Sequence, residues 1–183
     1  MFIEKGYEQT TLADIVAHAG GSMSTIYKLF GNKDRLLQEV VLDNAASGEA
    51  VIFFAERAGL APGPTLRLIA RELHTLFLHP DVVAIVRTVI ERSVSNPQFA
   101  HQFFDRTAYR TRDAVEGLFR RWQATGVPMN GSPEFLADMF IGLFVNDLQT
   151  QAISHGARGR VPPERLEERT EFFIAAAGIP RST

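Results

Sequence analysis

The side chains best suited to chemistry in this sequence are short polar ones near its start. Between residues 22 and 30, apolar residues recur at spacings of three and four, which predicts a helix with one apolar face. The other face carries Ser24, Thr25 and Lys28, with Tyr27 beside them. Hydroxyl groups can bond to base edges and a lysine attracts phosphates. This pattern therefore predicts a helix that reads the major groove of DNA.

Capping signals on both sides predict the elements that hold this helix in place. Thr11 is suited to cap a preceding helix that ends near Ala19, and the pair Gly20-Gly21 then stops it. Ser22 is suited to cap the polar helix itself. Lys33 lies at the start of a third helix, where an ammonium group and free backbone amides can together hold a phosphate. Two short helices around a tight turn predict a helix-turn-helix.

The same stretch contains Gly6-Tyr7, Thr10-Thr11, Asp14-Ile15, Ala19-Gly20, Ser22, Thr25-Ile26-Tyr27, Phe30, Asn32-Lys33 and Leu36-Leu37. This set of residues resembles the DNA-binding domain of the TetR family of one-component transcriptional regulators. The resemblance implies contacts with phosphates or bases at Thr11, Ser22, Thr25, Tyr27 and Lys33. With the two further residues of the polar face, the predicted DNA contacts are Thr11, Ser22, Ser24, Thr25, Tyr27, Lys28 and Lys33. Because the family has a full helix before Gly6, residues 1–5 are interpreted as the last turn of a truncated first helix.

Composition limits the other possibilities. The chain has 183 residues, 45% of them hydrophobic and none of them cysteine, which excludes disulfides and thiol chemistry. Its longest apolar run, residues 139–145, is far shorter than the roughly 20 residues that span a bilayer, and no signal peptide is recognisable. We therefore expect a soluble cytoplasmic protein without a membrane partner. The net charge is −2, so any DNA contact must come from a local patch.

Periodicity and turn signals predict an all-α protein with two parts. A DNA-binding domain is expected at residues 1–40 and a helical effector-binding and dimerisation domain at residues 41–183. A long helix from Lys33 to Ala58 joins them, with Gly48 as its weak point. Further helices are expected at residues 65–78, 81–94, 98–124, 134–154 and 164–177. No stretch shows the period-two alternation of a strand.

A second resemblance covers most of residues 65–155. The residues that carry it are Arg87-Thr88-Val89-Ile90-Glu91, Pro97, Phe99, Phe103, Phe104 and Leu143-Phe144-Val145-Asn146-Asp147-Leu148. They resemble the ligand-binding domain of the AefR-like subgroup of the TetR family, which implies a small-molecule effector. The predicted effector pocket is Phe77, Arg87, Glu91, Phe103, Phe104, Trp122, Phe140, Phe144 and Asp147. The alternatives are that the aromatic residues form ordinary core and that Arg87 and Glu91 form a surface ion pair.

The helix at 134–154 is apolar on nearly all sides around residues 140–145, so one face needs a partner beyond the core. With the last helix, at 164–177, it predicts a homodimeric four-helix contact, as the family resemblance also implies. Such a two-fold dimer suits two half-sites on double-stranded operator DNA. The alternative is that the last helix only caps its own subunit.

These patterns predict a TetR-like regulator, a homodimeric repressor that a small hydrophobic effector releases from its operator. Repression is implied by the resemblance alone. An enzyme is not expected, because no nucleophile with its base can be named, and the five histidines lack metal-helix spacing, so neither cofactor nor metal is expected. The main alternative is a helical ligand-binding or scaffold module without DNA binding. It is favoured by residues 1–40, which hold four Lys and Arg against five Asp and Glu.

Overall fold

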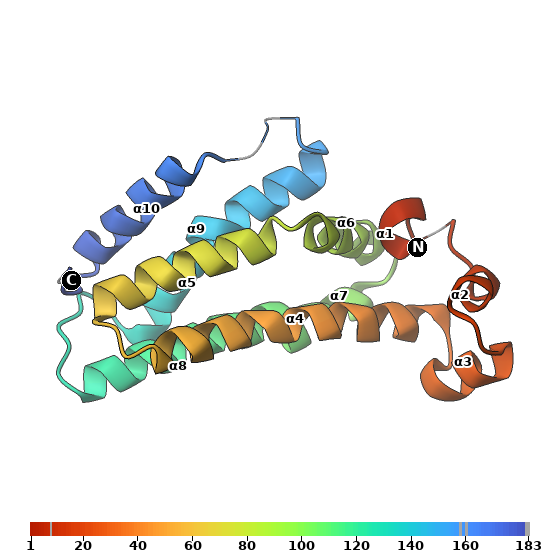
Figure 1. Ribbon diagram of the computed structural model, residues 1–183, viewed down its shortest axis with the longest axis horizontal. Coiled ribbons are helices and arrows are strands. Elements are labelled where there is room, and N and C mark those ends of the chain that lie inside the picture. Colours follow the sequence, from red (N-terminus) through yellow and green to blue (C-terminus); the bar gives the residue numbers. More distant parts are fainter. Residues whose placement is uncertain (8, 158, 160, 182–183) are drawn as a thin grey trace.

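The protein is described by a computed structural model that covers residues 1–7, 9–157, 159 and 161–181, without the side chains of residues 3, 4, 38 and 41–47. In this part of the chain all regular structure is helical (Figure 1), which confirms the all-α class. The helices are α1 Phe2–Lys5, α2 Leu12–Ala19, α3 Met23–Phe30, α4 Lys33–Arg57, α5 Pro62–Phe77, α6 Pro80–Ser95, α7 Pro97–Phe103, α8 Tyr109–Ala124, α9 Pro133–Ser154 and α10 Pro163–Ala176. A π-helical turn, η1 Phe104–Ala108, joins α7 to α8.

The molecule is elongated, with α1 to α3 at one end and α5, α8 and α10 reaching the other (Figure 1). The 25-residue helix α4 runs along its length and packs against α5 and α8. At a rise of 1.5 Å per residue, such a helix spans roughly 36 Å. Helix α4 therefore connects the end that carries the polar helix to the helical body.

Side-chain caps define the three helices at this end. The Thr11 hydroxyl accepts a hydrogen bond from the Asp14 amide at 3.1 Å, and the Thr11 amide donates to the Asp14 carboxylate at 3.0 Å. The Thr11 hydroxyl also donates to the Asp14 carboxylate, and this bond, together with the one from the Thr11 amide, holds the pKa of Asp14 below its ordinary value. Ser22 and Asn32 cap α3 and α4 in the same way, through bonds to backbone amides three residues later. The predicted starts of all three helices rest on this cap chemistry.

The main core lies in the helical body. It is made by α4, α5, α8, α9 and α10, and its largest side chains include Phe119, Phe140 and Phe144, each at most 1% exposed. A smaller cluster of Tyr7, Leu37, Ile85, Val89 and Phe99 joins the first residues and α4 to α6 and α7. This second cluster fixes the end that carries α1 to α3 against the body.

One predicted helix is interrupted. The segment 98–124 was expected to be a single helix, but η1 inserts a π-helical turn in it at Phe104–Ala108. There the Thr107 hydroxyl donates to the Phe103 carbonyl at 2.5 Å. Such turns leave no periodic signal in the sequence, and they are frequent at functional sites.

Among the described helices, no single one is long and apolar enough to cross a membrane. The pair α5 and α6 passes that test only jointly, across a bend of 66°.

Candidate DNA-reading surface and effector cavity

Helix α3 presents its polar residues to solvent. None of its residues is buried, and Ser22, Ser24, Thr25 and Lys28 are all exposed. The Tyr27 ring is 54% exposed. The Ser22 hydroxyl lies 2.7 Å from that of Ser24 and 2.9 Å from that of Thr25, so three hydroxyl groups gather at the start of the helix. This arrangement leaves the face free to approach a duplex.

The two flanking residues of the predicted set have local partners. The Thr11 hydroxyl is exposed and donates to the Asp14 carboxylate at 2.6 Å. Lys33 is half-buried, and its Nζ lies 4.0 Å from the centroid of the Tyr7 ring. A phosphate contact by Lys33 would therefore have to compete with, or extend from, this cation–π contact.

A polar joint connects this end to α6. We define the joint as Tyr7, Lys33, Asp34 and Arg92. The Arg92 guanidinium donates to the Asp34 carboxylate at 2.7 Å, and the Tyr7 hydroxyl donates to the same oxygen. The Arg92 Cζ also lies 4.4 Å from the Tyr7 ring centroid, so this ring is flanked by two cations. The pairing spans 58 residues of sequence, and no local pattern predicted it.

A cavity of about 140 Å³ lies in the body, between the π-helical turn and α4, α5, α6, α8 and α9. Its described lining is Gly48, Leu76, Phe77, Val82, Ile85, Val86, Phe103, Phe104, Thr107, Ala108, Thr111, Ile141, Val145, Leu148 and Gln149. No ionisable side chain occurs in this described lining. Small-molecule sites commonly have this apolar character with a few polar groups.

The structure separates the predicted pocket residues. Phe77, Phe103 and Phe104 line the cavity. Phe140 and Phe144 instead pack against each other in the main core, with ring centroids 5.3 Å apart. Trp122 packs on Phe119 at 5.7 Å, also on the core side. For these last three predicted residues the ordinary-core alternative describes the packing.

The predicted inward group of Arg87, Glu91 and Asp147 is not formed. Arg87 Nε donates to the Ala152 carbonyl at 3.0 Å, which ties α6 to α9. Glu91 is exposed, and Asp147 accepts a bond of 2.6 Å from Arg169. Sequence spacing placed the first two on one helix face but could not show that α10 supplies the partner of Asp147.

A buried polar site lies beside this ion pair. Asp147 is only 5% exposed, and His74 of α5 lies close enough to it and to Arg169 to feel both charges. The His74 Nε2 is buried and has no hydrogen-bond partner. Burial lowers the pKa of His74, Asp147 opposes that shift and Arg169 adds to it. Burial therefore favours the neutral imidazole.

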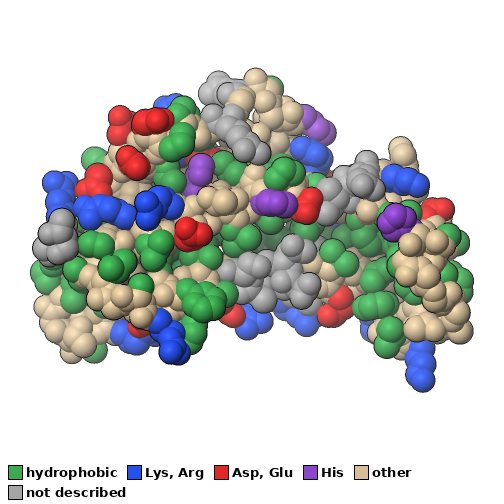
Figure 2. Space-filling model, in the orientation of Figure 1, with side chains coloured by type: hydrophobic (Ala, Val, Ile, Leu, Met, Phe, Trp, Pro, Cys, Tyr) green, Lys and Arg blue, Asp and Glu red, His purple; other side chains and the backbone are tan. Residues whose placement is uncertain are grey.

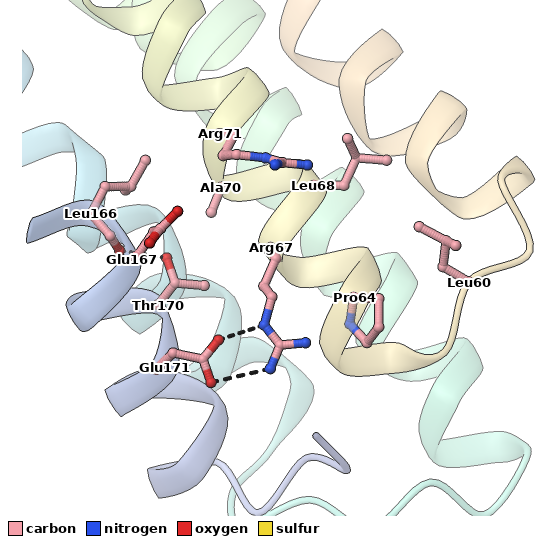
Figure 3. Close-up of a pocket in the computed structure, with 10 residues that line it drawn as sticks. All are labelled: Leu60, Pro64, Arg67, Leu68, Ala70, Arg71, Leu166, Glu167, Thr170 and Glu171. Atoms are coloured by element: carbon pink, nitrogen blue, oxygen red, sulfur yellow. Dashed lines mark hydrogen bonds and ion pairs between the residues drawn. The ribbon is translucent and has the colours of Figure 1, made fainter. Parts of the chain in front are cut away.

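A larger open groove of about 420 Å³ lies between α5 and α10 (Figure 3). Arg67 and Glu171 reach across it, and their two bonds measure 2.5 Å and 3.1 Å. Hydrogen bonding to Arg67 lowers the pKa of Glu171. Acidic and basic side chains are also mixed over this end of the surface (Figure 2). The groove therefore presents no charge of one sign to a ligand.

The helices predicted to dimerise carry exposed apolar residues. On α9, Phe135, Met139 and Ile153 are 54%, 51% and 66% exposed, and on α10 Phe172 is 75% exposed. Their core-facing neighbours Phe140 and Phe173 are buried, so both helices are apolar on two sides. The described residues contain no group of three or more His, Asp or Glu side chains that could hold a metal.

A helix-turn-helix with an exposed polar face, joined by one long helix to a body with an apolar cavity, is an arrangement typical of helix-turn-helix transcriptional regulators. Residues 1–40 match the family described as bacterial regulatory proteins, tetR family, and residues 64–176 match the AefR-like transcriptional repressor, C-terminal domain. The chain therefore belongs to the TetR family of transcriptional regulators.

Solved structures agree with this assignment. A TetR-family transcriptional regulator from Mesorhizobium loti MAFF303099 is 25% identical, with a TM-score of 0.82 over 95% of this chain and 89% of that one. The flavonoid-responsive regulator FrrA is 26% identical, with a TM-score of 0.71 over 99% and 92%. GusR of Salmonella enterica, at 16% identity and a TM-score of 0.70 over 97% and 89%, shares the fold. None of the curated proteins compared with the sequence matches it.

Proposed function

We propose that this TetR-family regulator binds operator DNA as a homodimer, represses transcription there, and is released by a small hydrophobic effector. The observation that carries the proposal is the solvent-facing polar side of α3, with its three hydroxyl groups, Tyr27 and Lys28. We place the DNA-binding domain at residues 1–40 and the effector-binding and dimerisation domain at 41–183. Action on operator DNA implies a cytoplasmic protein.

The exposed apolar side chains of α9 and α10 support the homodimer. The exposed Phe172 of α10 and the exposed apolar residues of α9 would lose their contact with water in a two-fold four-helix interface. We expect Phe172→Asp to give monomers in size-exclusion chromatography with light scattering. Phe54→Asp is the matched control, because Phe54 is 69% exposed but lies on α4. Equal elution of both variants at the dimer position would contradict this interface.

The effector role rests on the cavity and on the relatives. FrrA is named as flavonoid-responsive, which supports release by a small molecule. The matched C-terminal family is described as transcriptional repressors, which supports repression. In the proposed linkage, an effector that fits one arrangement of the body better than another changes the separation of the two α3 helices. The dimer then no longer matches its half-sites.

The deciding experiment is fluorescence anisotropy with labelled DNA from upstream of the protein's own reading frame, at several salt concentrations. We expect DNA binding to weaken as the salt concentration rises. Tyr27→Ala should weaken binding at every operator. Lys28→Ala or Lys33→Ala should reduce the slope of log affinity against log salt concentration by about one. Thr25→Ala should change base preference instead. Tyr109→Ala is the matched control for Tyr27→Ala, because Tyr109 is 53% exposed on the body. An unchanged slope for Lys33→Ala would show that this lysine serves only the polar joint.

The near-neutral charge of residues 1–40 favours the second candidate, a helical ligand-binding or scaffold module without DNA binding. The same titration separates the two. Binding with a salt slope near zero, or equal binding to unrelated duplexes, would support the module and contradict the regulator. In vitro transcription from the bound fragment then tests whether the protein represses, since a repressor lowers the transcript level and its effector restores it.

A further inference from the structure

We infer that the effector is an uncharged single-ring compound that bears one hydroxyl or carbonyl group. The inference rests on the proposed function, because it assigns the ligand class of the same cavity. It commits to the size, the charge and the polar group of the ligand. Each of these follows from a different feature of the described lining.

The size follows from the volume. The cavity has a volume of about 140 Å³. A dry protein cavity of about 150 Å³ accepts a benzene ring, and drug-sized ligands need about 300 Å³ or more. Phe77, Phe103 and Phe104 supply ring faces and edges around this space, which suit a planar aromatic body. One ring therefore fills the cavity as it stands.

The charge follows from the chemistry of the walls. A carboxylate or ammonium group moved from water into an apolar site is strongly disfavoured unless it is paired. The described lining offers no ionisable partner. Among the described residues on the helices around the cavity, Arg87 bonds to the Ala152 carbonyl and Asp147 bonds to Arg169. The phenylalanine rings could still attract a cation, so both signs of charge must be tested.

The polar group follows from two side chains that line the cavity. Thr111 is 5% exposed and lines the cavity, with its hydroxyl beside Gly48 of α4. Gln149 also lines the cavity, and its side chain is exposed. The Thr107 hydroxyl already donates its proton to the Phe103 carbonyl. Thr111 and Gln149 therefore provide a donor and an acceptor that a hydroxyl or carbonyl group of the ligand can use.

The test uses three ligands of one shape and different charge. Isothermal titration calorimetry of the full chain at pH 7 compares benzyl alcohol, benzoate and benzylamine, which are neutral, anionic and cationic. We expect benzyl alcohol to bind on the order of 100-fold more tightly than either ion, because the ions lose hydration without gaining a partner. A two-ring alcohol, 1-naphthalenemethanol, should bind more weakly than benzyl alcohol. Tighter binding of either ion, tighter binding of the two-ring alcohol, or no binding of benzyl alcohol at millimolar concentration overturns the inference.

Two variants test the polar contacts. Thr111→Val keeps the side-chain shape and should weaken benzyl alcohol binding about fivefold to tenfold, and Gln149→Leu should weaken it by a similar factor. Thr75→Val and Gln123→Leu are matched controls, because both residues are exposed and lie outside the cavity lining. Gln149 is itself exposed, so its variant keeps the test valid if Thr111→Val fails to fold. Unchanged affinity in Gln149→Leu and in a folded Thr111→Val overturns the assigned contacts.

The calorimetry needs no DNA, so the two proposals can fail separately. Selective binding of benzyl alcohol without any operator binding would leave the ligand class standing and contradict the regulator. Operator binding that is released by benzoate or benzylamine but not by benzyl alcohol would support the regulator and overturn the ligand class.

Discussion

The contact between α4 and α8 at Gly48 gives a sharp test of the packing around the cavity. A Cβ added to Gly48 would lie 2.3 Å from Thr111 Oγ1 and 3.0 Å from Thr111 Cγ2. Thr111 is buried and β-branched, so its side chain has little freedom to turn away within a helix. In Gly48→Ala the two helices must therefore separate where both line the cavity.

The magnitude follows from two opposing effects. Replacing glycine by alanine within a helix stabilises a protein by about 1 kcal/mol, whereas overpacking costs about 1–3 kcal/mol. Gly117→Ala is the matched control on α8, because its new Cβ would meet only the end of the flexible Arg121 side chain, at 3.2 Å. The control should gain stability and Gly48→Ala should not. We expect the two variants to differ by about 2 kcal/mol, or about 4–8 °C in Tm for a chain of this length.

Thermal and urea unfolding at one protein concentration would measure this difference, since a dimer makes Tm depend on concentration. A Thr111→Ala background removes the two nearest atoms and keeps the Cβ of residue 111 at 3.2 Å from the new methyl group. Gly48→Ala should then become stabilising, with a coupling energy of about 1–2 kcal/mol. The reasoning is refuted if Gly48→Ala raises Tm as much as Gly117→Ala, or if its effect is the same in both backgrounds.

Three further outcomes can be checked. Burial holds the pKa of His74 below 6.5, so the unfolded chain binds this proton more readily and stability falls as pH drops below 6.5. His74→Gln should therefore flatten the fall in Tm measured between pH 7.5 and pH 5.5, and an equally steep fall would contradict the burial argument. Arg67 lowers the pKa of Glu171, so their pair stabilises the fold above the ordinary pKa and loses this effect in acid. Glu171→Gln should lower the unfolding free energy at pH 7 by less than about 1 kcal/mol, because both side chains of the pair are more than a third exposed and water screens their charges. A larger loss of unfolding free energy would contradict this screening. Asp34→Asn removes the charge that Arg92 contacts. We expect a bound effector to change operator affinity less in this variant than in the unaltered protein, as measured by anisotropy. An equal change in both would show that the polar joint does not couple the effector cavity to the operator.

Local chemistry made the helices of residues 11–33 predictable from sequence. Thr11 and Ser22 set helix starts through bonds to amides three residues away, and a glycine with positive φ, Gly20 at 78°, ends α2. These signals lie within a few residues of the elements that they define. The helix starts and ends could therefore be predicted before any tertiary contact was known.

The cavity was only partly predictable, because aromatic periodicity cannot distinguish a pocket wall from a core. Phe103 and Phe104 line the cavity because the π-helical turn begins there, and nothing in the residue pattern indicates that turn. Phe140 has the same apolar surroundings in sequence but packs in the core. Gly48 was predicted only as a weak point of α4, whereas the structure shows that its missing side chain permits the contact with Thr111.

In the proposed linkage, the polar joint would connect a ligand in the body to the helices at the other end of the molecule. Helix α6 contributes Val82, Ile85 and Val86 to the cavity, and Arg92 lies six residues beyond the last of them, about 9 Å along the helix. Arg92 holds Asp34 in the first turn of α4, directly after the α3 helix and its cap. A displacement of α6 by a ligand must therefore either carry the start of α4 with it or break a charged hydrogen bond. Because such coupling is reciprocal, operator DNA that favours one position of α4 must weaken effector binding by the same factor by which the effector weakens DNA binding.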